Sequence, residues 1–443
     1  MFSKLFSKLF SSSQPMIIPK PLEMEVNWGY FTLKDNFVVY LDPKIDLQHI
    51  SIFIAEHILP PTGYHFQNKT TNQNESQLCF VYDSEVVDEG YFIKLTSKQL
   101  TIRSSTPSGH FYGLVTFMQL LPCEIYSDIK SDITEWKAPC VTIRDSPQYS
   151  WRGMHLDCSR HFFTVSEVKK YIYWMSLHKL NKFHWHLTDD QGWRFESKKY
   201  PKLTEIGSIL IEKDGTQYGP YFYTQAEMRE IVSYAKNLCI TVVPEIEMPG
   251  HSEAVYKSYP ELFCHVTVPE NHIWAKYIYN KAYCISQKST IDFLKEILAE
   301  VIEIFDSEYI HIGGDEVIPL YWEECEKCKS FMSENHFRYV KEYQAWFTGL
   351  IAEFLHENGR KMIGWDEIIN DNLPKESVVM VWRMALIGEV ATGLCHQVIF
   401  APNEYLYFDH QQFHSHDGDE PYSYFSGPCS TINNVYSYNP MEG

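Results

Sequence analysis

The sequence predicts an α/β fold in which a (β/α)8 TIM-type barrel, lacking its eighth strand in this chain, follows a smaller α+β domain. From about residue 147, apolar runs of strand length alternate with helical stretches of a dozen or more residues, a pattern typical of βα units and a parallel sheet. Polar side chains follow each of these runs, as they do at the carboxyl ends of barrel strands. A chain of 443 residues is also long enough for two domains.

The first part of the chain is predicted to be a non-catalytic α+β domain at residues 16–145, preceded by a flexible tail at 1–15. Its two expected helices cover residues 49–58 and 113–121. Its strands are expected where short β-type runs occur, at 30–33, 37–41, 78–82, 91–95 and 100–103.

The barrel is predicted over residues 146–443. Its expected strands are 149–156, 182–187, 240–246, 309–313, 361–365, 378–382 and 398–408. The polar residues that follow them in turn are Asp157 and Arg160, Asp189 and Asp190, Glu247 and His251, Asp315 and Glu316, Asp366 and Glu367, Arg383, and Asp409. After Asp409 no further β-type run occurs, so we expect the barrel to be incomplete at its C-terminal side.

Composition limits the partners. A formal net charge of −19 argues against binding to nucleic acid or to an anionic membrane surface. No apolar run approaches the roughly 18 residues that span a bilayer, so we expect no membrane span. Aromatic residues make up 15% of the chain, which suits a carbohydrate partner because sugars present apolar faces. Lys4 and Lys8 interrupt the apolar stretch of a signal peptide, and the compartment stays unknown.

The eleven cysteines are an odd number without the density of a disulfide scaffold, which favours a reducing compartment. Cys325 and Cys328 form a CxxC pair. No second pair lies near it in the sequence, so we expect no metal there.

The string from His311 to Val317 ends an apolar run with two glycines and two carboxylates, Asp315 and Glu316. Glycines let a ligand approach the backbone closely, and neighbouring ionised carboxylates raise the pKa of one of them, as a general acid requires. The string resembles the catalytic motif of glycoside hydrolase family 20, the β-N-acetylhexosaminidases. Further resemblances to this family occur in chain order on both sides.

Two of these resemblances precede the acid pair. Residues 151–162 resemble the first-strand motif, which implies that Arg160 binds sugar hydroxyls; a structural Asp157–Arg160 ion pair is the alternative. Residues 184–193 resemble the second-strand motif, which implies that Asp189 contacts the sugar and that His186 supports the acid.

His184 and His186 share one face of a strand, so a catalytic metal bound together with His251 and His311 is a second possibility. Residues 244–251 resemble the third-strand motif, in which an acid and a histidine tune the general acid. This places those roles on Glu247 and His251, with a surface Glu–His pair as the alternative.

The resemblance implies that Glu316 is the general acid and base and that Asp315 orients the substrate. Adjacent residues on an extended strand point to opposite sides, so the two carboxylates are not expected to face each other across a bond. In this family the 2-acetamido oxygen of the substrate attacks C1 instead, giving an oxazolinium ion that water opens with retention.

Trp365 and Trp382 resemble the tryptophans that wall the acetamido pocket, although both could be core residues. Tyr407 and Asp409 are expected on one face of the last strand. There the resemblance implies that Tyr407 hydrogen-bonds the acetamido oxygen and that Asp409 binds a ring hydroxyl. The family's eighth-strand tryptophan and glutamate have no counterpart here.

We therefore expect a retaining exo-β-N-acetylhexosaminidase without a cofactor, acting on terminal N-acetylglucosamine or N-acetylgalactosamine. The alternatives are a truncated, non-catalytic glycan-binding barrel and a metal-dependent barrel hydrolase. The sequence leaves the preferred sugar and the oligomeric state open.

Overall fold

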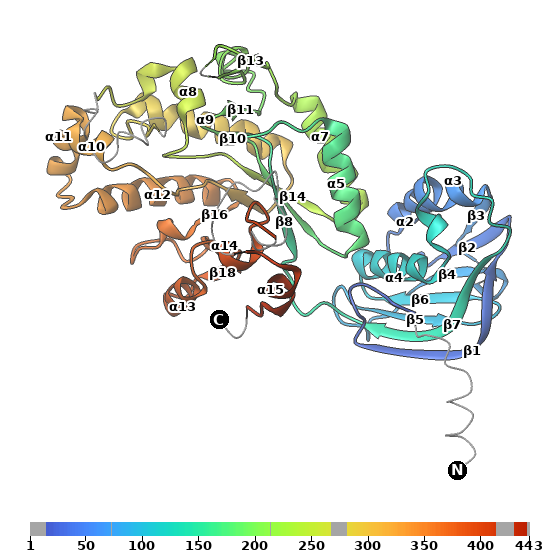
Figure 1. Cartoon of the computed structure of the whole chain (residues 1–443). Helices are drawn as coiled ribbons and strands as arrows, with labels where there is room; N and C mark the ends of the chain where they lie inside the picture. The colour runs from blue at the N-terminus through green and yellow to red at the C-terminus, as the bar shows by residue number, and fades with distance from the viewer. Residues whose placement is uncertain (1–14, 72, 213, 267–280, 413–428, 441–443) are drawn as a thin grey trace. The chain divides into compact units, whose positions relative to one another are not determined.

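A computed structural model describes residues 15–71, 73–212, 214–266, 281–412 and 429–440 (Figure 1). The chain forms two compact units. One holds the residues up to Met154 together with Ser166–Lys182 and Ser233–Thr241, and the other holds the rest. Nearly all of the expected flexible tail lies outside the described residues, and the domain boundaries drawn from the sequence stay a prediction.

The first unit is built on a mixed seven-stranded sheet in the order β1-β7-β5-β6-β4-β2-β3. Its strands are β1 (Glu23–Leu33), β2 (Phe37–Leu41), β3 (Phe66–Lys69), β4 (Leu78–Tyr82), β5 (Tyr91–Leu95), β6 (Leu100–Ser104) and β7 (Trp136–Asp145). The sequence located five of these strands and missed β3 and β7. Strand β3 is a short polar edge strand, and β7 buries mainly one face of a run that also contains charged residues and a proline.

Helix α4 (Pro107–Leu120) lies against this sheet (Figure 1). The Thr106 hydroxyl oxygen caps its N-terminus by accepting a hydrogen bond from the Gly109 amide at 3.2 Å. The expected helix at 49–58 is α2 (Gln48–Phe53) continued by η1 (Ile54–Ile58). Shorter helical segments of the unit are α3 (Leu59–Thr62), η2 (Gln73–Glu75) and η3 (Cys123–Tyr126).

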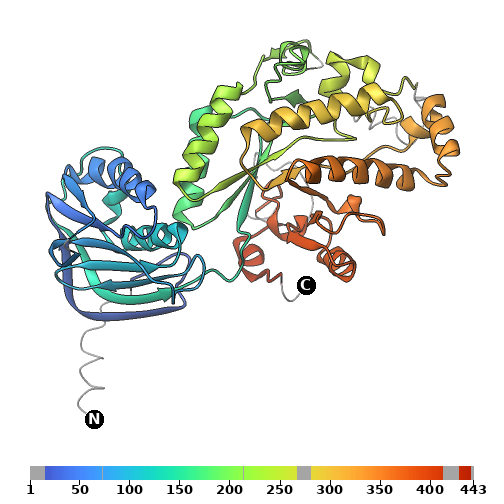
Figure 2. The ribbon, with the colours of Figure 1, turned by 180° about the vertical axis from the view of Figure 1, so that it is seen from behind.

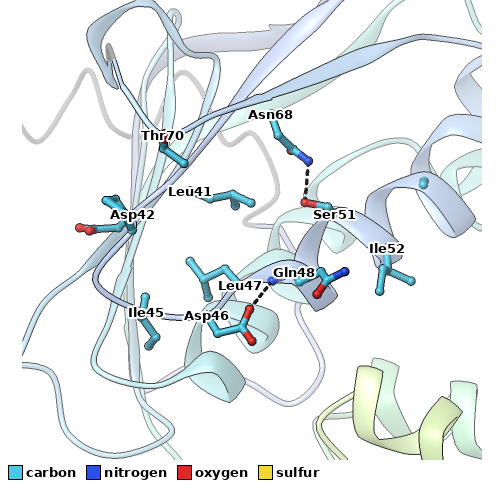
Figure 3. Close-up of a pocket in the computed structure, with 12 residues that line it drawn as sticks. Leu41, Asp42, Ile45, Asp46, Leu47, Gln48, Ser51, Ile52, Asn68 and Thr70 are labelled. Carbon is cyan, nitrogen blue, oxygen red and sulfur yellow. Dashed lines mark hydrogen bonds between the residues drawn. The ribbon is translucent and has the colours of Figure 1, made fainter.

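A hollow of about 530 Å³ lies between β2 and α2 (Figure 3). Beside it the Asn68 side-chain amide donates to the Ser51 hydroxyl at 2.9 Å, and Asp46 accepts from the Gln48 amide at 3.1 Å. None of its lining residues is among those that the sequence singles out for the active site.

The barrel sheet has the order β18-β17-β16-β15-β14-β9-β8, and the strands from β14 to β18 pair in parallel. Its strands are β8 (Gly153–Asp157), β9 (Lys182–His186), β14 (Thr241–Glu245), β15 (Tyr309–His311), β16 (Lys361–Trp365), β17 (Val378–Val381) and β18 (Gln397–Phe400). The predicted fold class is confirmed, with seven sheet strands within the described part of the barrel. Two small hairpins stand apart from this sheet, β10 (Thr188–Asp189) with β11 (Gly192–Trp193) and β12 (Leu210–Ile211) with β13 (Gln217–Tyr218).

Helices follow the barrel strands along the chain. They are α5 (Val165–Leu177), α6 (Lys202–Glu205), α7 (Gln225–Asn237), α8 (Glu253–Ser258), η4 (Pro260–Leu262), α9 (Lys288–Ile304), α10 (Leu320–Glu324), α11 (Glu326–Glu334), α12 (Val340–Glu357), η6 (Asp366–Ile368), α13 (Ala385–Gly393), α14 (Asn403–Leu406) and α15 (Ile432–Ser437). Helix α9 buries an apolar stripe at helical spacing, including Phe293, Ile297 and Val301. It lies beside α12, as both views show (Figure 1 and Figure 2).

The last predicted strand, 398–408, is too long. Strand β18 ends at Phe400, and α14 begins at Asn403. Pro402 lies between them, and because proline has no N–H to donate to a sheet, it ends the strand. Tyr407 and Asp409 therefore follow a helical turn and do not share the face of a strand.

Within the described part of the chain, no helix is long and apolar enough to cross a bilayer. None of the eleven cysteines, all of which lie within the described residues, forms a disulfide.

Candidate active site

The acid pair lies on a tight turn after β15. Gly313, Gly314 and Glu316 have φ angles of +68°, +94° and +45°, so the backbone is left-handed where an extended strand was expected. This turn brings both carboxylates to one histidine. His251 Nε2 is 3.5 Å from Asp315 Oδ2 and 3.4 Å from Glu316 Oε2. The expectation that the two acids point to opposite sides is wrong.

Gly313 allows the turn to pack against a buried acid. A Cβ atom at this position would lie 1.7 Å from Oε2 of Glu247. Both the positive φ and this close approach therefore require glycine at position 313.

His251 connects the acid pair to two further carboxylates. Its Nδ1 atom is 3.2 Å from Asp189 Oδ1 and 3.4 Å from Asp190 Oδ2. Burial alone would lower the pKa of His251, but the charges of Asp315 and Asp189 and the hydrogen bonds to Asp189 and Asp190 raise it well above its usual value. The site therefore holds a buried imidazolium between two pairs of acids.

The two acids of the pair differ in environment. The Asp315 side chain is 16% exposed, and its Oδ1 atom is buried without a hydrogen-bond partner among the described residues. Burial raises the pKa of Asp315, and the charges of Glu245 and Asp189 add to this effect. The Glu316 side chain is 57% exposed, and its hydrogen bond with His251 lowers the pKa of Glu316. One pKa of the pair is raised as predicted, but burial is the main cause and the raised group is Asp315.

Arg160 makes the ion pair with Asp157 that was the alternative to a sugar-binding role, and it makes a second ion pair with Asp189; the sugar-binding role stays a prediction. Its Nη1 atom donates to Asp157 Oδ2 at 2.8 Å, and Nη2 is 2.7 Å from Asp189 Oδ2. Burial would raise the pKa of Asp189, but the charges of Arg160 and His251 hold it well below its usual range. Asp189 thus stays ionised between two cations.

A further carboxylate, Glu245 at the end of β14, is fully buried, and the sequence analysis gave it no role. His186 Nδ1 lies 2.5 Å and His184 Nε2 lies 2.9 Å from its Oε2 atom. Its Oε1 atom accepts from the Trp365 indole at 2.9 Å and is 2.8 Å from His311 Nδ1. The predicted common face of His184 and His186 is confirmed.

The histidines keep Glu245 charged. Burial would raise the pKa of Glu245, but its electrostatic interactions with His311, His186 and His184 hold it well below its usual range. A glutamate inside an apolar strand could have been recognised in the sequence, because a buried carboxylate needs donors and the HxH pair supplies them. The resemblance drew attention to Glu247 instead.

His186 links this centre to Asp189, whose Oδ2 atom is 2.9 Å from His186 Nε2. Burial would lower the pKa of His186, but the charges of Glu245 and Asp157 raise it to about 10. Ligand atoms of His155, His186 and Glu245, and those of His184, Glu245 and His311, lie close enough together to hold a metal ion. A metal ligand is a neutral imidazole, however, and both nitrogens of His186 already face carboxylates. These contacts favour a hydrogen-bonded network.

Glu247 and His251 are 2% and 7% exposed, so the alternative of a surface pair is wrong. Burial raises the pKa of Glu247 well above its usual value, and the charges of Asp315 and Glu245 add to this effect. Its Oε2 atom has no hydrogen-bond partner within the described residues. Burial and the neighbouring charges therefore favour the protonated form of Glu247.

The two predicted tryptophans lie in different surroundings. Trp365 is 7% exposed and packs edge-on against His311, with ring centroids 4.8 Å apart. Trp382 is partly exposed and stacks on Tyr407 at 6.3 Å and an interplanar angle of 22°. The Trp382 indole donates to Glu367 at 3.1 Å. Trp365 thus has the packing of a core residue, and the role of both indoles in an acetamido pocket stays a prediction.

The last two predicted residues follow α14. Burial and the charge of Asp315 raise the pKa of Tyr407 well above its usual value, which places the phenol within electrostatic reach of the acid pair. Asp409 is exposed. Burial and Asp315 also raise the pKa of Glu367, to about 8. Glu367 is thus a further member of the site to which the sequence analysis gave no role.

Known protein families match the chain in two parts. Residues 149–443 match the catalytic domain of glycosyl hydrolase family 20, and residues 14–146 match domain 2 of that family. A β-hexosaminidase of Porphyromonas gingivalis is 35% identical over 433 residues, which are 96% of this chain and 54% of that protein. One of Vibrio furnissii is 31% identical over 443 residues, covering 96% of this chain and 68% of that protein. The chain thus spans about half the length of the first relative and two thirds of the second.

Solved structures show the same similarity. A β-N-acetylhexosaminidase of Bacteroides fragilis superposes with a TM-score of 0.81 at 31% identity, over 96% of this chain and 82% of the other. An exo-β-N-acetylglucosaminidase of Vibrio harveyi in complex with N-acetylglucosamine superposes with a TM-score of 0.84 at 28% identity, over 97% and 66% of the two chains. By its sequence, its barrel and its acid pair, this chain belongs to glycosyl hydrolase family 20.

Proposed function

We propose that this chain hydrolyses terminal β-linked N-acetylglucosamine or N-acetylgalactosamine with retention of configuration, by substrate-assisted catalysis and without a cofactor. One observation carries the proposal: the carboxylates of Asp315 and Glu316, one partly buried and one exposed, converge on the same imidazolium. The names of the relatives from Porphyromonas gingivalis and Vibrio furnissii, both β-hexosaminidases, support the substrate class.

Asp315 orients the nucleophile in this proposal. Its buried Oδ1 atom has no donor among the described residues, and a substrate acetamido N–H would supply one. The hydrogen bond would favour the ionised carboxylate, since a donor stabilises the charged form. The negative charge would then stabilise the oxazolinium ion electrostatically.

Glu316 moves the protons. As the acetamido oxygen forms its bond to C1, the glycosidic C1–O bond breaks and Glu316 gives its proton to the leaving oxygen. Water then attacks C1, Glu316 takes a proton from it, and the bond between C1 and the acetamido oxygen breaks. The imidazolium of His251 stabilises the carboxylate of Glu316 between the two steps.

Glu316 must be protonated for the first step, although its pKa is lowered in the substrate-free protein. A bound sugar would cover its side chain, which is 57% exposed without substrate. Loss of solvent disfavours the charged form, so binding moves the pKa of Glu316 upward. The basic limb of the pH profile, on which the general acid loses its proton, should therefore lie at higher pH for kcat than for kcat/KM.

The decisive experiment is hydrolysis of an aryl β-N-acetylglucosaminide by the wild type, Glu316→Gln and, as a matched control, Glu357→Gln. Glu357 is an exposed residue at the end of α12. We expect Glu316→Gln to lower kcat by roughly 10²–10⁴-fold and the control to keep full activity.

A loss below threefold in Glu316→Gln would remove this residue from its role. A folded wild type that binds N-acetylglucosamine without cleaving the aryl glycoside would identify a glycan-binding barrel. Cleavage at an equal rate of a substrate without the acetamido group would exclude substrate assistance.

A further inference from the structure

The CxxC pair meets two further cysteines in the folded chain. The ligand atoms of Cys264, Cys284, Cys325 and Cys328 all lie within 4.8 Å of one another. Cys264, Cys284 and Cys328 are 5%, 1% and 0% exposed, and Cys325 is partly buried. The second pair is more than 40 residues away from Cys325 in the sequence, which is why the spacing did not reveal it.

From this geometry we propose that the four cysteines bind one zinc ion as a structural tetrathiolate site, outside the active site. Four sulfurs placed tetrahedrally about 2.3 Å from zinc lie about 3.8 Å from one another. The Sγ atom of Cys328 lies 3.5 Å from that of Cys264 and 3.7 Å from that of Cys284. Soft thiolates in this arrangement select zinc over hard cations.

Disulfides fit the cluster less well. Cys328 has two cysteine sulfurs at nearly equal distances, and it can form a disulfide with only one of them. Any pairing of the four cysteines into two disulfides therefore leaves one of these two short sulfur–sulfur contacts unbonded, whereas one central ion accounts for both contacts and satisfies all four sulfurs together.

Surrounding groups suit bound thiolates. The Tyr343 hydroxyl donates to Cys328 Sγ at 3.6 Å, and the Ser286 hydroxyl lies 3.4 Å from Cys284 Sγ. Hydrogen bonds of this kind orient metal ligands and disperse their charge. Cys325 and Cys328 also lie at the N-terminus of α11, where the helix dipole favours thiolates.

The proposed ion would join the two segments that carry the catalytic groups. Cys284 N–H donates to Leu262 O at 2.9 Å, and Tyr283 N–H donates to Pro249 O at 3.0 Å, two residues before His251. The Trp322 indole of α10 donates to Tyr283 O at 2.8 Å. Helices α10 and α11 adjoin in Figure 1, and they follow the acid pair in the chain. The zinc would thus hold the segment after β14 to the segment after β15.

The test is the metal content of the full chain, purified without chelators and measured by elemental analysis. We expect one zinc per chain, and a loss of zinc in Cys328→Ser. Cys140→Ser, at a buried cysteine of β7 outside the cluster, is the matched control and should keep the ion. Cys325→His should also keep it, because imidazole replaces a thiolate in zinc sites but cannot form a disulfide.

Cobalt substitution of the wild type gives a readout that does not depend on the folding of any variant. Thiolate-to-cobalt charge-transfer bands with the ligand-field bands of a tetrahedral complex are expected. Three results would each overturn the proposal: no zinc in the reduced wild type after incubation with zinc, one equivalent retained in Cys328→Ser, or a disulfide among the four cysteines found by mass spectrometry of the freshly isolated chain. All of these are independent of glycosidase activity, so the site and the proposed function can fail separately.

Discussion

Gly313→Ala tests whether the acid-pair turn depends on the close packing of Gly313 against Glu247. The new methyl group would lie 1.7 Å from Glu247 Oε2, where Cβ contacts below 3.0 Å essentially never occur, so the carboxyl group must move by about 1.3 Å. Such overpacking of a buried site costs about 1–3 kcal/mol. An L-residue at a φ of +68° costs a further 1–2 kcal/mol or so. We expect a total loss of unfolding free energy of about 2–5 kcal/mol.

A double-mutant cycle separates the two effects. In a Glu247→Ala background the overlap disappears and only the backbone cost of Gly313→Ala remains, so the coupling free energy should be about 1–3 kcal/mol. The assay is urea unfolding of the four proteins of the cycle, followed by tryptophan fluorescence. Gly349→Ala is the control, because Gly349 lies within α12 with open space at its Cβ position. It should stabilise the protein by about 0.5–1 kcal/mol.

The same cost for Gly313→Ala with and without the Glu247 side chain would refute the packing argument. A loss that is smaller by about 1–3 kcal/mol in the Glu247→Ala background than in the wild-type background would support it.

Three further predictions concern single carboxylates. Asp315→Asn should lower kcat on an aryl N-acetylglucosaminide by roughly 10²–10³-fold, since it removes the charge that stabilises the oxazolinium ion. Asp371→Asn, in an exposed loop, is the control. Equal kcat values for the two variants would contradict the role of Asp315. Glu245→Ala should cost about 3–5 kcal/mol of unfolding free energy because it leaves the buried imidazolium of His186 without its carboxylate partner at Nδ1. The exposed Glu308→Ala should cost less than about 1 kcal/mol. Similar losses for the two variants in urea unfolding would argue against the buried centre. The pKa of Glu367 is raised to about 8 in the folded protein. The stability of the wild type relative to Glu367→Gln should therefore be greatest below pH 4.5 and should fall as the pH rises to about 8. A difference in melting temperature between the two proteins that does not change with pH would show that folding does not raise the pKa of Glu367.

The parts of the fold that could be predicted are those that local pattern determines. Strand β16 was placed at its observed bounds because its apolar run is continuous. The last strand was placed eight residues too far because apolar and aromatic residues continue beyond Pro402 into α14. Pro402 indicates the end of the strand, but the aromatic residues after it favoured the prediction of a longer strand.

The site residues could be located by their order along the chain, but their contacts could not. The left-handed backbone at Glu316 reverses the direction expected from an extended strand, and nothing in a two-residue pattern indicates it. The partners of Glu245 come from four strands, β8, β9, β15 and β16. Two cysteines of the cluster, Cys264 and Cys284, come from loops far from the CxxC pair in the sequence. Such long-range contacts depend on the order of the strands in the assembled sheet, and a local sequence pattern does not contain that order.

The hydrogen-bond ladder between β14 and β15 continues past the ends of the two strands. Ile246 N–H donates to His311 O, and Met248 N–H donates to Ile312 O, each at 3.0 Å. The segment that leads to His251 is therefore hydrogen-bonded to the segment that leads to the acid pair. Either segment can open only if these hydrogen bonds break, so we expect the two segments to open together as one cooperative unit. The imidazolium and the carboxylates that it joins would then keep their spacing while the surrounding surface moves.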